Sequence, residues 1–405
     1  MTTTLRSDAR VIGLVGLAHG VSHFYHLILA ALFVWLKPAF DLSYAELGLL
    51  MTVFFIISGV GQALAGFVVD RFGARAVLFA GMLLLGISAL ALAQAHSYTG
   101  LMLGAMLAGT GNSVFHPADY TILNQRVSPA RVAYGFSMHG ISGNIGWALA
   151  PLFMTFMATH YDWRVALMSA SVLPFLVLLV LFLNRHAIRP EPLKSRAAPA
   201  KGGLPAEGTL AFLRLPAVWM CFAFFFITAI ALGGIQSFAS VALVKLYGMS
   251  LALATSAYTA YMLASAVGMA AGGVLGARST QPDRNVAIAF SAAALLAVLL
   301  GMNLVPAWGA VVLMGAIGLT SGVAGPSRDL MIRAAAPPNA TGRVYGVVYS
   351  GLDSGLAVGP LLFGALMDGD QPALVFVFIG VFQALAIVTA VGVGGKARAV
   401  ALQKA

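Results

Sequence analysis

Long apolar segments separated by short polar ones recur along nearly the whole chain. Twelve of them contain about 20 or more mostly apolar residues, the length that crosses a hydrocarbon core of ~30 Å. We expect helices there, because barrel strands would show segments of ~10 residues with alternating polarity. The first segment is too long for a signal peptide and lacks a small-residue cleavage site, so we expect it to remain in the protein. The predicted spans are residues 11–36, 45–69, 75–96, 98–124, 132–159, 164–184, 213–245, 250–277, 286–304, 307–332, 341–367 and 373–395.

The composition supports a membrane protein. Of the 405 residues, 60% are hydrophobic and only 9% are charged, whereas a soluble domain carries roughly 25% charged residues. This excludes a soluble globular enzyme. The single cysteine, Cys221, also excludes a disulfide framework and a cysteine-based metal site.

The basic residues predict the topology. The formal net charge is +10, which by itself could indicate nucleic-acid binding. With a cytoplasmic N-terminus, all of the 23 Lys and Arg residues fall at cytoplasmic ends except Lys37, Arg164, Lys245 and Arg328. This asymmetry follows the positive-inside rule, so we expect both termini in the cytoplasm and no nucleic-acid partner.

The chain divides into two similar halves. Residues 185–212, rich in Pro, Gly and basic residues, are expected to form a cytoplasmic linker between six spans in 1–184 and six in 213–405. A shift of 209 residues aligns 111–119 with 320–328, and Pro151 with Pro360. The sequence therefore predicts an all-α membrane protein with twelve transmembrane helices in two pseudo-symmetric halves, the plan of a secondary transporter.

A short motif follows the second span. Residues 66–75 read GFVVDRFGAR, which resembles the major facilitator signature G-x-x-x-D-R-x-G-R-R, with Ala74 in place of one basic residue. The resemblance covers the whole chain and implies the major facilitator fold. It also implies a cytoplasmic latch whose Asp70 lies near the start of the eleventh span, and the latch residues are Gly66, Asp70, Arg71, Gly73 and Arg75.

Two further stretches resemble the fosmidomycin-resistance type of exporter within this superfamily. They are residues 109–117 (GTGNSVFHP) and residues 143–146 (GNIG), the latter followed by Pro151 and Leu152. The resemblance implies an efflux transporter in the cytoplasmic membrane of a bacterium. The histidines of the first span depart from that type and leave its substrate open.

Polar residues inside predicted spans are candidates for the site, because a charge at mid-bilayer costs at least ~2.5–3.5 kcal/mol. His19, His23 and His26 share one helix face, and His26 is the most expendable because it lies nearest the outer half. In the fourth span His116 and Asp119 are neighbours, and Pro117 is expected to kink the helix. The histidines are interpreted as a proton-titrating or ligand-binding row; the alternative is neutral histidines that only support packing.

The 209-residue shift places Arg328 opposite Asp119. We expect these two to form a gating ion pair; alternatively Arg328 binds an anionic substrate such as a phosphonate or carboxylate, or both residues only fix packing. Trp147, Tyr258 and Tyr261 are interpreted as packing residues. The remaining candidates for substrate binding or proton coupling are His139, Asn144, Gln236, Asp329 and Asp353.

The predicted function is a proton-coupled secondary transporter, an efflux antiporter of a small organic and possibly anionic molecule, with no enzymatic activity and no cofactor. Motifs of ATP-driven pumps, metalloproteases and serine esterases are absent. The expected partners are the substrate, protons and the bilayer, and we expect a monomer. One alternative is a transporter of a divalent metal ion or metal chelate that uses His19, His23, His116 and Asp119 as ligands. The other is a membrane receptor or enzyme on the same scaffold.

Overall fold

The computed structural model describes residues 2–128, 131–189, 214–278, 281–335 and 341–404. All regular elements in these ranges are helices. They are α1 (Thr2–Tyr25), the 3₁₀ helix η1 (Ala30–Leu32), α2 (Phe33–Phe40), α3 (Tyr44–Phe72), α4 (Ala74–Ala93), α5 (Tyr98–Asn112), α6 (Phe115–Arg126), α7 (Val132–His160), α8 (Trp163–Leu183), α9 (Pro216–Tyr247), α10 (Leu251–Arg278), α11 (Pro282–Gly301), α12 (Ala307–Ala335), α13 (Thr341–Asp368) and α14 (Pro372–Lys404).

The helices confirm a multi-pass membrane protein. Within the described residues, ten are long and apolar enough to cross a bilayer, and the bent pair formed by α1 with η1 and α2 would make an eleventh. That pair bends by 42°, so the predicted span 11–36 is not one straight helix. The remaining predicted span, 98–124, is formed by the two shorter helices α5 and α6.

The break between α5 and α6 has a local cause. Pro117 has no N–H to bond with the carbonyl of Ser113, four residues earlier, so the helix ends at this point. Helical bonding resumes where Ala118 N donates to Val114 O at 3.0 Å. The helix is thus interrupted at Ser113 and Val114, one turn before Pro117, whereas Pro326, its counterpart in the repeat, lies inside the continuous helix α12.

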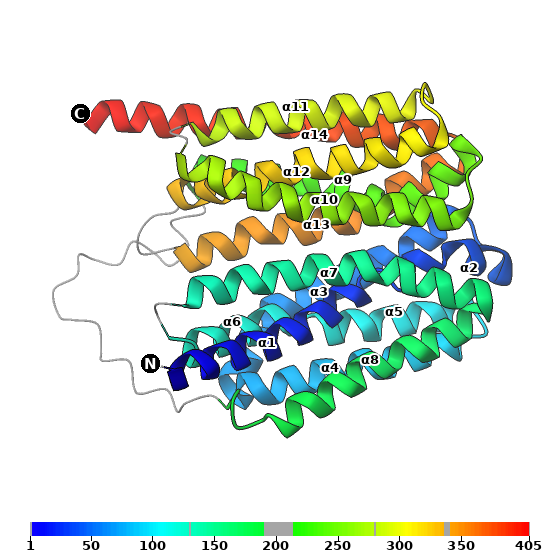
Figure 1. Ribbon diagram of the computed structural model, residues 1–405, viewed down its shortest axis with the longest axis horizontal. Coiled ribbons are helices and arrows are strands. Elements are labelled where there is room, and N and C mark those ends of the chain that lie inside the picture. Colours follow the sequence, from blue (N-terminus) through cyan, green and yellow to red (C-terminus); the bar gives the residue numbers. More distant parts are fainter. Residues whose placement is uncertain (1, 129–130, 190–213, 279–280, 336–340, 405) are drawn as a thin grey trace.

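The helices pack in two groups (Figure 1). Helices α1 to α8 mainly contact one another, as do α9 to α14. The groups meet chiefly where α3 packs on α13 and where α7 packs on α10, a boundary called the seam below. The start of α1 and the end of α14 lie at the same end of the bundle.

At one end of the seam, a carboxylate of one group caps a helix of the other. Asp368, at the end of α13, accepts hydrogen bonds from the backbone N–H groups of Tyr44 (2.7 Å) and Ala45 (2.8 Å) at the start of α3. The same helix start carries a capping box between Ser43 and Glu46. Both features satisfy N–H groups that the first turn of a helix leaves without partners.

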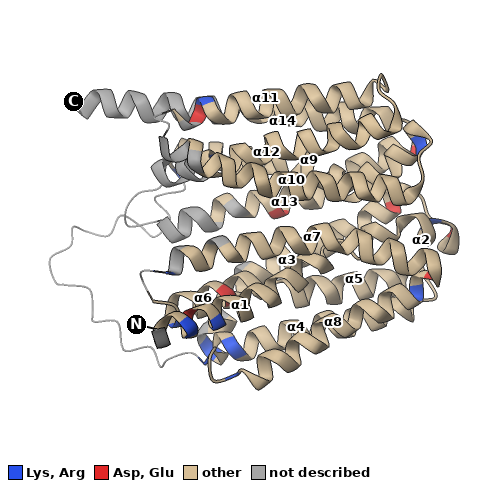
Figure 2. Cartoon of the chain, viewed as in Figure 1, with Lys and Arg blue, Asp and Glu red and all other residues tan. Residues whose placement is uncertain are grey.

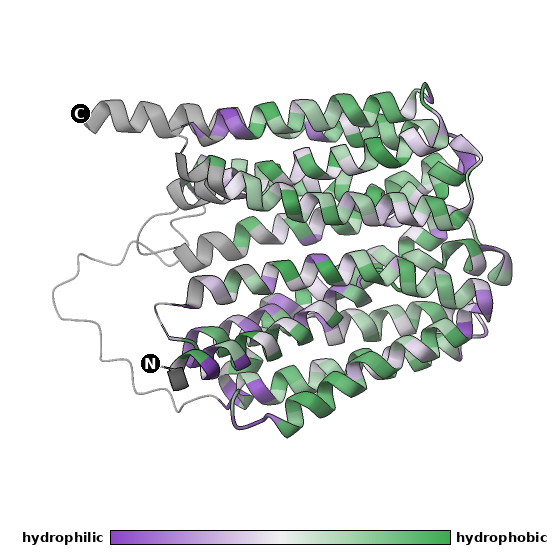
Figure 3. Cartoon of the chain, in the orientation of Figure 1, coloured by the Kyte–Doolittle hydropathy of each residue, from purple (hydrophilic) through white to green (hydrophobic). Residues whose placement is uncertain are grey.

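Charged side chains avoid the middle of the bundle. Figure 2 shows most of the coloured basic and acidic residues at the two ends of the helices, and Figure 3 shows mostly hydrophobic residues along their length. This distribution is the one that a hydrocarbon environment imposes. The few polar side chains inside the bundle are therefore the candidates for function.

The turn between α3 and α4 contains the signature motif. Gly73 adopts φ of 84° there, a conformation that favours glycine. Arg75 donates a hydrogen bond to the carbonyl of Arg185 at 3.2 Å, which ties this turn to the chain that follows α8. The side chains of Asp70 and of the first residues of α13 lie outside the described residues, so the predicted position of Asp70 beside α13 stays a prediction.

A candidate site built from five histidines

Five histidine side chains meet inside the group formed by α1 to α8. His19 and His23 lie on α1 and His26 lies at its end, while His116 comes from α6 and His139 from α7. The His19 and His139 side chains are only 2% and 3% exposed. Polar groups so deeply buried need specific partners, and the contacts of each histidine show what those partners are.

The three histidines of the first span form a continuous row, as their spacing predicted. The ring centroids of His19 and His23 are 4.2 Å apart, and those of His23 and His26 are 4.7 Å apart. The row lies against α7 at Gly143, where a Cβ atom would come within 2.5 Å of His23 Nδ1 and 2.9 Å of His19 Cε1. Glycine at this position makes room for both rings.

Asp119 and His139 anchor one side of the cluster. His139 Nε2 donates to Asp119 Oδ2 at 3.1 Å, and Asp119 is fully buried. The backbone carbonyl of His139 accepts a hydrogen bond from His19 Nδ1 at 2.8 Å. The other carboxylate oxygen of Asp119, Oδ1, has no partner among the described residues.

The expected ion pair between Asp119 and Arg328 is not formed in this structure. The carboxylate of Asp119 is bonded to His139 on the neighbouring helix of its own group. The guanidinium carbon of Arg328 on α12 lies 4.7 Å from the ring centroid of Phe225 on α9. The sequence repeat suggested equal depths for the two residues, but it contained no information about the closer partner on α7.

A second set of contacts leads from the cluster to the seam. The ring of His116 lies 5.4 Å from that of His19, so the two are neighbours as predicted. His116 Nδ1 bonds to Gln62 Oε1 at 2.7 Å, and Gln62 Nε2 donates to Asp353 Oδ2 at 3.3 Å. Gln62 lies on α3 and Asp353 on α13, so this short bridge joins the histidine cluster to the other group of helices.

His26 is fully paired within a local network. Its Nε2 donates to Asn112 Oδ1 at 3.2 Å, and its Nδ1 accepts from Trp147 Nε1 at 3.2 Å. Asn112 also accepts from Ser22 and donates to Ser58. Both ring nitrogens of a neutral His26 are therefore satisfied, which fits its lower rank among the candidates.

Trp147 has more than the packing role that the sequence indicated. Its indole N–H holds His26, and its ring stacks on His23 with centroids 4.3 Å apart. Gln62 was also missed, because a single glutamine in an apolar helix carries little signal. Asn112 belongs to the GTGNSVFHP stretch, which is the one feature of the sequence that could have identified it.

Other candidates are not brought into this cluster by a described contact. Gln236 on α9 is buried, and neither Nε2 nor Oε1 has a partner among the described residues. Asn144 on α7 is partly buried, and the side chain of Asp329 lies outside the described residues. Gln236 is thus a buried polar residue outside the histidine cluster, in the group of helices formed by α9 to α14.

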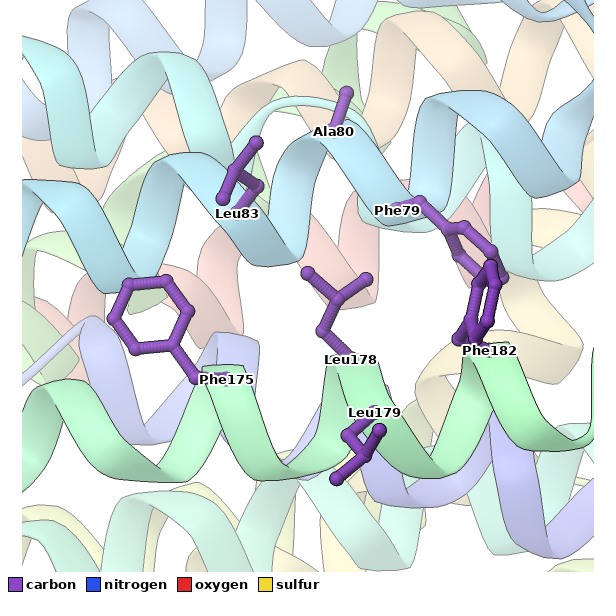
Figure 4. Close-up of a pocket in the computed structure, with 7 residues that line it drawn as sticks. All are labelled: Phe79, Ala80, Leu83, Phe175, Leu178, Leu179 and Phe182. Carbon is purple, nitrogen blue, oxygen red and sulfur yellow. The ribbon is translucent and has the colours of Figure 1, made fainter.

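A separate groove of about 460 Å³ lies between α4 and α8. Figure 4 shows leucine and phenylalanine side chains around it, and its lining residues are Phe79, Ala80, Leu83, Phe175, Leu178, Leu179 and Phe182. All seven are apolar, as expected for a surface in contact with lipid chains. The groove shares no lining residue with the histidine cluster and offers no group that could recognise a polar substrate.

The comparisons with known proteins define the class. The chain matches the family model of the Major Facilitator Superfamily over residues 15–316 and 243–398, and it belongs to that family. The protein is therefore a membrane transporter, and the alternative of an enzyme is set aside because the family consists of non-enzymatic transport proteins. The predicted fold class is confirmed as well.

The chain is similar to bacterial proteins whose names point to different functions. The fosmidomycin resistance protein of Escherichia coli is 24% identical over 277 residues, which are 68% of this chain and 67% of that protein. The probable nitrate/nitrite transporter NarK2 of Mycobacterium tuberculosis is 27% identical over 342 residues, 81% of each chain. A crystal structure of a bacterial homologue of the human lysosomal transporter Spinster, inward-facing and occupied, superposes with a TM-score of 0.73 at 15% identity, covering 97% of this chain and 96% of that one.

Proposed function

We propose that this protein is a proton-coupled efflux antiporter of a small organic anion. The observation that carries the proposal is the buried group of acids and histidines that runs from Asp119, through the cluster, to Asp353 at the seam. Ionisable groups inside a membrane are expensive and mark substrate or proton pathways. A pathway that ends between the two groups of helices is placed to respond to their movement.

The coupled proton belongs, in this proposal, to the two carboxylates. Asp119 has no exposure, and its Oδ1 has no partner in the described part of the chain. A proton on Oδ1 neutralises this buried charge while Oδ2 keeps its bond to His139. Asp353 accepts from Gln62 across the seam, so a change in the seam changes the environment of its carboxylate directly.

The transport cycle follows from the packing. Residues 1–184 and 213–405 are proposed to be two halves joined by the linker 185–212, which rock about the site between them. The distribution of basic residues supports a cytoplasmic position of both termini in this proposal, and the bacterial relatives support the cytoplasmic membrane of a bacterium as the location. A monomer is sufficient for this cycle.

Two residues of the structure and one relative support an anionic substrate. Arg328 is a cation inside α12, and Gln236 offers buried amide groups on α9. Both belong to the group of helices opposite the histidine cluster. The relative named for nitrate and nitrite also carries an anion.

The test uses purified protein in proteoliposomes with an acidic interior. Antiport predicts that an external substrate accumulates inside as protons leave, and that an ionophore abolishes the accumulation. Fosmidomycin and nitrite, taken from the names of the relatives, are the first probes, followed by a panel of small carboxylates. Substrate that only equilibrates, without accumulation driven by the pH gradient, contradicts proton coupling.

Two acid variants and a histidine control assign the proton. Asp119→Asn and Asp353→Asn are expected to lose accumulation but to retain exchange of labelled for unlabelled substrate, which requires no net proton movement. His96→Gln, at an exposed position between α4 and α5, should behave like the wild type. Full accumulation in both acid variants would remove these carboxylates from the mechanism.

A further inference from the structure

The hydrogen bonds of the cluster determine which ring nitrogens of its neutral histidines carry no hydrogen and can only accept a hydrogen bond. The carbonyl oxygen of His139 accepts the bond from His19 Nδ1, so Nδ1 carries the hydrogen. In the neutral ring, Nε2 then carries no hydrogen and has a free electron pair. That atom is buried and has no partner among the described residues.

The contact with Gln62 determines the tautomer of His116. While Asp353 is ionised its carboxylate can only accept, so the atom of Gln62 that faces it is the amide nitrogen, and Oε1 faces His116. His116 Nδ1 must therefore carry the hydrogen. Its Nε2 is a second lone pair in the neutral ring.

His23 completes the group. Its Nδ1 is buried without a partner in the described part of the chain. One ring nitrogen from each of His19, His23 and His116 can be chosen so that the three lie within 4.8 Å of one another. At least two of these rings offer an electron pair, and His19 Nε2 has no donor among the described residues, an arrangement that a cation satisfies.

We propose that His19, His23 and His116 form a binding site for a divalent transition-metal ion of the Zn²⁺, Co²⁺ and Ni²⁺ class. Neutral imidazole is a preferred ligand of these ions. Nitrogen ligands lie about 2.0–2.1 Å from zinc, which places two of them roughly 3.3 Å apart in a tetrahedron. Binding therefore draws the three rings together, and the fourth position remains for water or an oxygen atom of a cargo.

The surroundings of two of the three rings, His19 and His116, match those of metal ligands in other proteins. A ligating histidine usually donates its other N–H to a carbonyl or carboxylate, which orients the ring and increases its basicity. His19 donates to a backbone carbonyl and His116 to Gln62 Oε1. Asp119 lies behind His139 and Asp353 lies behind Gln62, so two carboxylates in the network can compensate the charge of a buried dication.

The inference does not depend on the proposed efflux of an organic anion, since it concerns binding at equilibrium. The experiment titrates Co²⁺ into the full chain, purified in detergent with a tag free of histidine and treated with a chelator beforehand. The expected result is one Co²⁺ per chain, with the intense visible absorption of a tetrahedral ion, and displacement of that ion by Zn²⁺. Proton-driven transport is measured separately on the same preparation.

Four variants locate the site. His19→Gln and His116→Gln should each weaken Co²⁺ binding by at least about 100-fold. Gln62→Ala removes no ligand; it removes the group that orients His116, together with the bond to Asp353, and should weaken Co²⁺ binding by about 10–100-fold. His96→Gln is the control for an exposed histidine, and thermal unfolding of each variant verifies that it is folded.

The outcomes separate the two proposals. Absence of stoichiometric Co²⁺ binding, or equal binding in His96→Gln and in the three cluster variants, overturns the metal site whatever the transport assays show. Stoichiometric binding that the three variants weaken supports it, even where accumulation driven by a pH gradient is absent. Absence of accumulation driven by a pH gradient contradicts only the proposed proton-coupled antiport.

Discussion

Substitution of Gly143 by alanine tests the packing of the histidine cluster without changing any ligand. The added Cβ would lie 2.5 Å from His23 Nδ1. An ordinary contact begins at 3.4 Å, so the ring would have to retreat by 3.4 − 2.5 = 0.9 Å. The His23 ring is in contact with the rings of His19, His26 and Trp147, which limits how far it can move.

The matched control is Gly140→Ala, one turn earlier on α7, where nothing lies within 4 Å of the added atom. Alanine favours a helix over glycine by about 1 kcal/mol at either position. Overpacking a filled interior costs about 1–3 kcal/mol. We therefore expect Gly143→Ala to be about 1–3 kcal/mol less stable than Gly140→Ala.

The assay is equilibrium unfolding of both variants in the same detergent, followed by a Co²⁺ titration of each. Gly143→Ala should also lose Co²⁺ affinity relative to Gly140→Ala, because the displaced rings can no longer converge. Equal stability and equal affinity of the two variants would show that the rings are not held against α7, and the reasoning about the cluster would then be refuted.

Three further outcomes follow from contacts elsewhere in the bundle. Gly146→Ala should be more damaging than Gly143→Ala in the same unfolding assay, because its Cβ would collide with the backbone oxygen of Gly20, which cannot rotate away. Trp147→Phe keeps the aromatic ring but removes the donor to His26, so it should lower the free energy of unfolding by about 1 kcal/mol. Asp368→Asn should weaken the cap on α3 by about 0.3–1 kcal/mol. Because the cap joins the two groups of helices, a cysteine placed in the seam should then react faster with a labelling reagent.

The membrane spans could be predicted from the sequence because their signal is strong and local. The long apolar segments correspond to the helices within a few residues, except that the first span is bent, the fourth is two helices, and α14 continues to Lys404, beyond the predicted end at residue 395. The interruption of the fourth span could have been located more accurately from the sequence. Pro117 indicated a disruption, and the carbonyl left without its helical hydrogen bond is that of Ser113, four residues earlier. The bend after Tyr25 has no proline or glycine in its vicinity to announce it.

The site was predictable only where its residues share a helix. The row formed by His19, His23 and His26 followed directly from the helical period. The bond between Asp119 and His139 was not predicted, because it depends on how α7 is rotated against α6; the gating pair of Asp119 with Arg328 stays a prediction. Gln62 was missed for the same reason, since only the tertiary structure places it between His116 and Asp353.

The cap on α3 also links the movement of the two helix groups to water. While the groups are in contact at that end, the N–H groups of Tyr44 and Ala45 are bonded to Asp368 on the opposite side. Separation leaves these donors without an acceptor from protein, and hydrocarbon offers none. The seam can therefore part at this end only where water reaches the start of α3, so opening and hydration of that end are a single event.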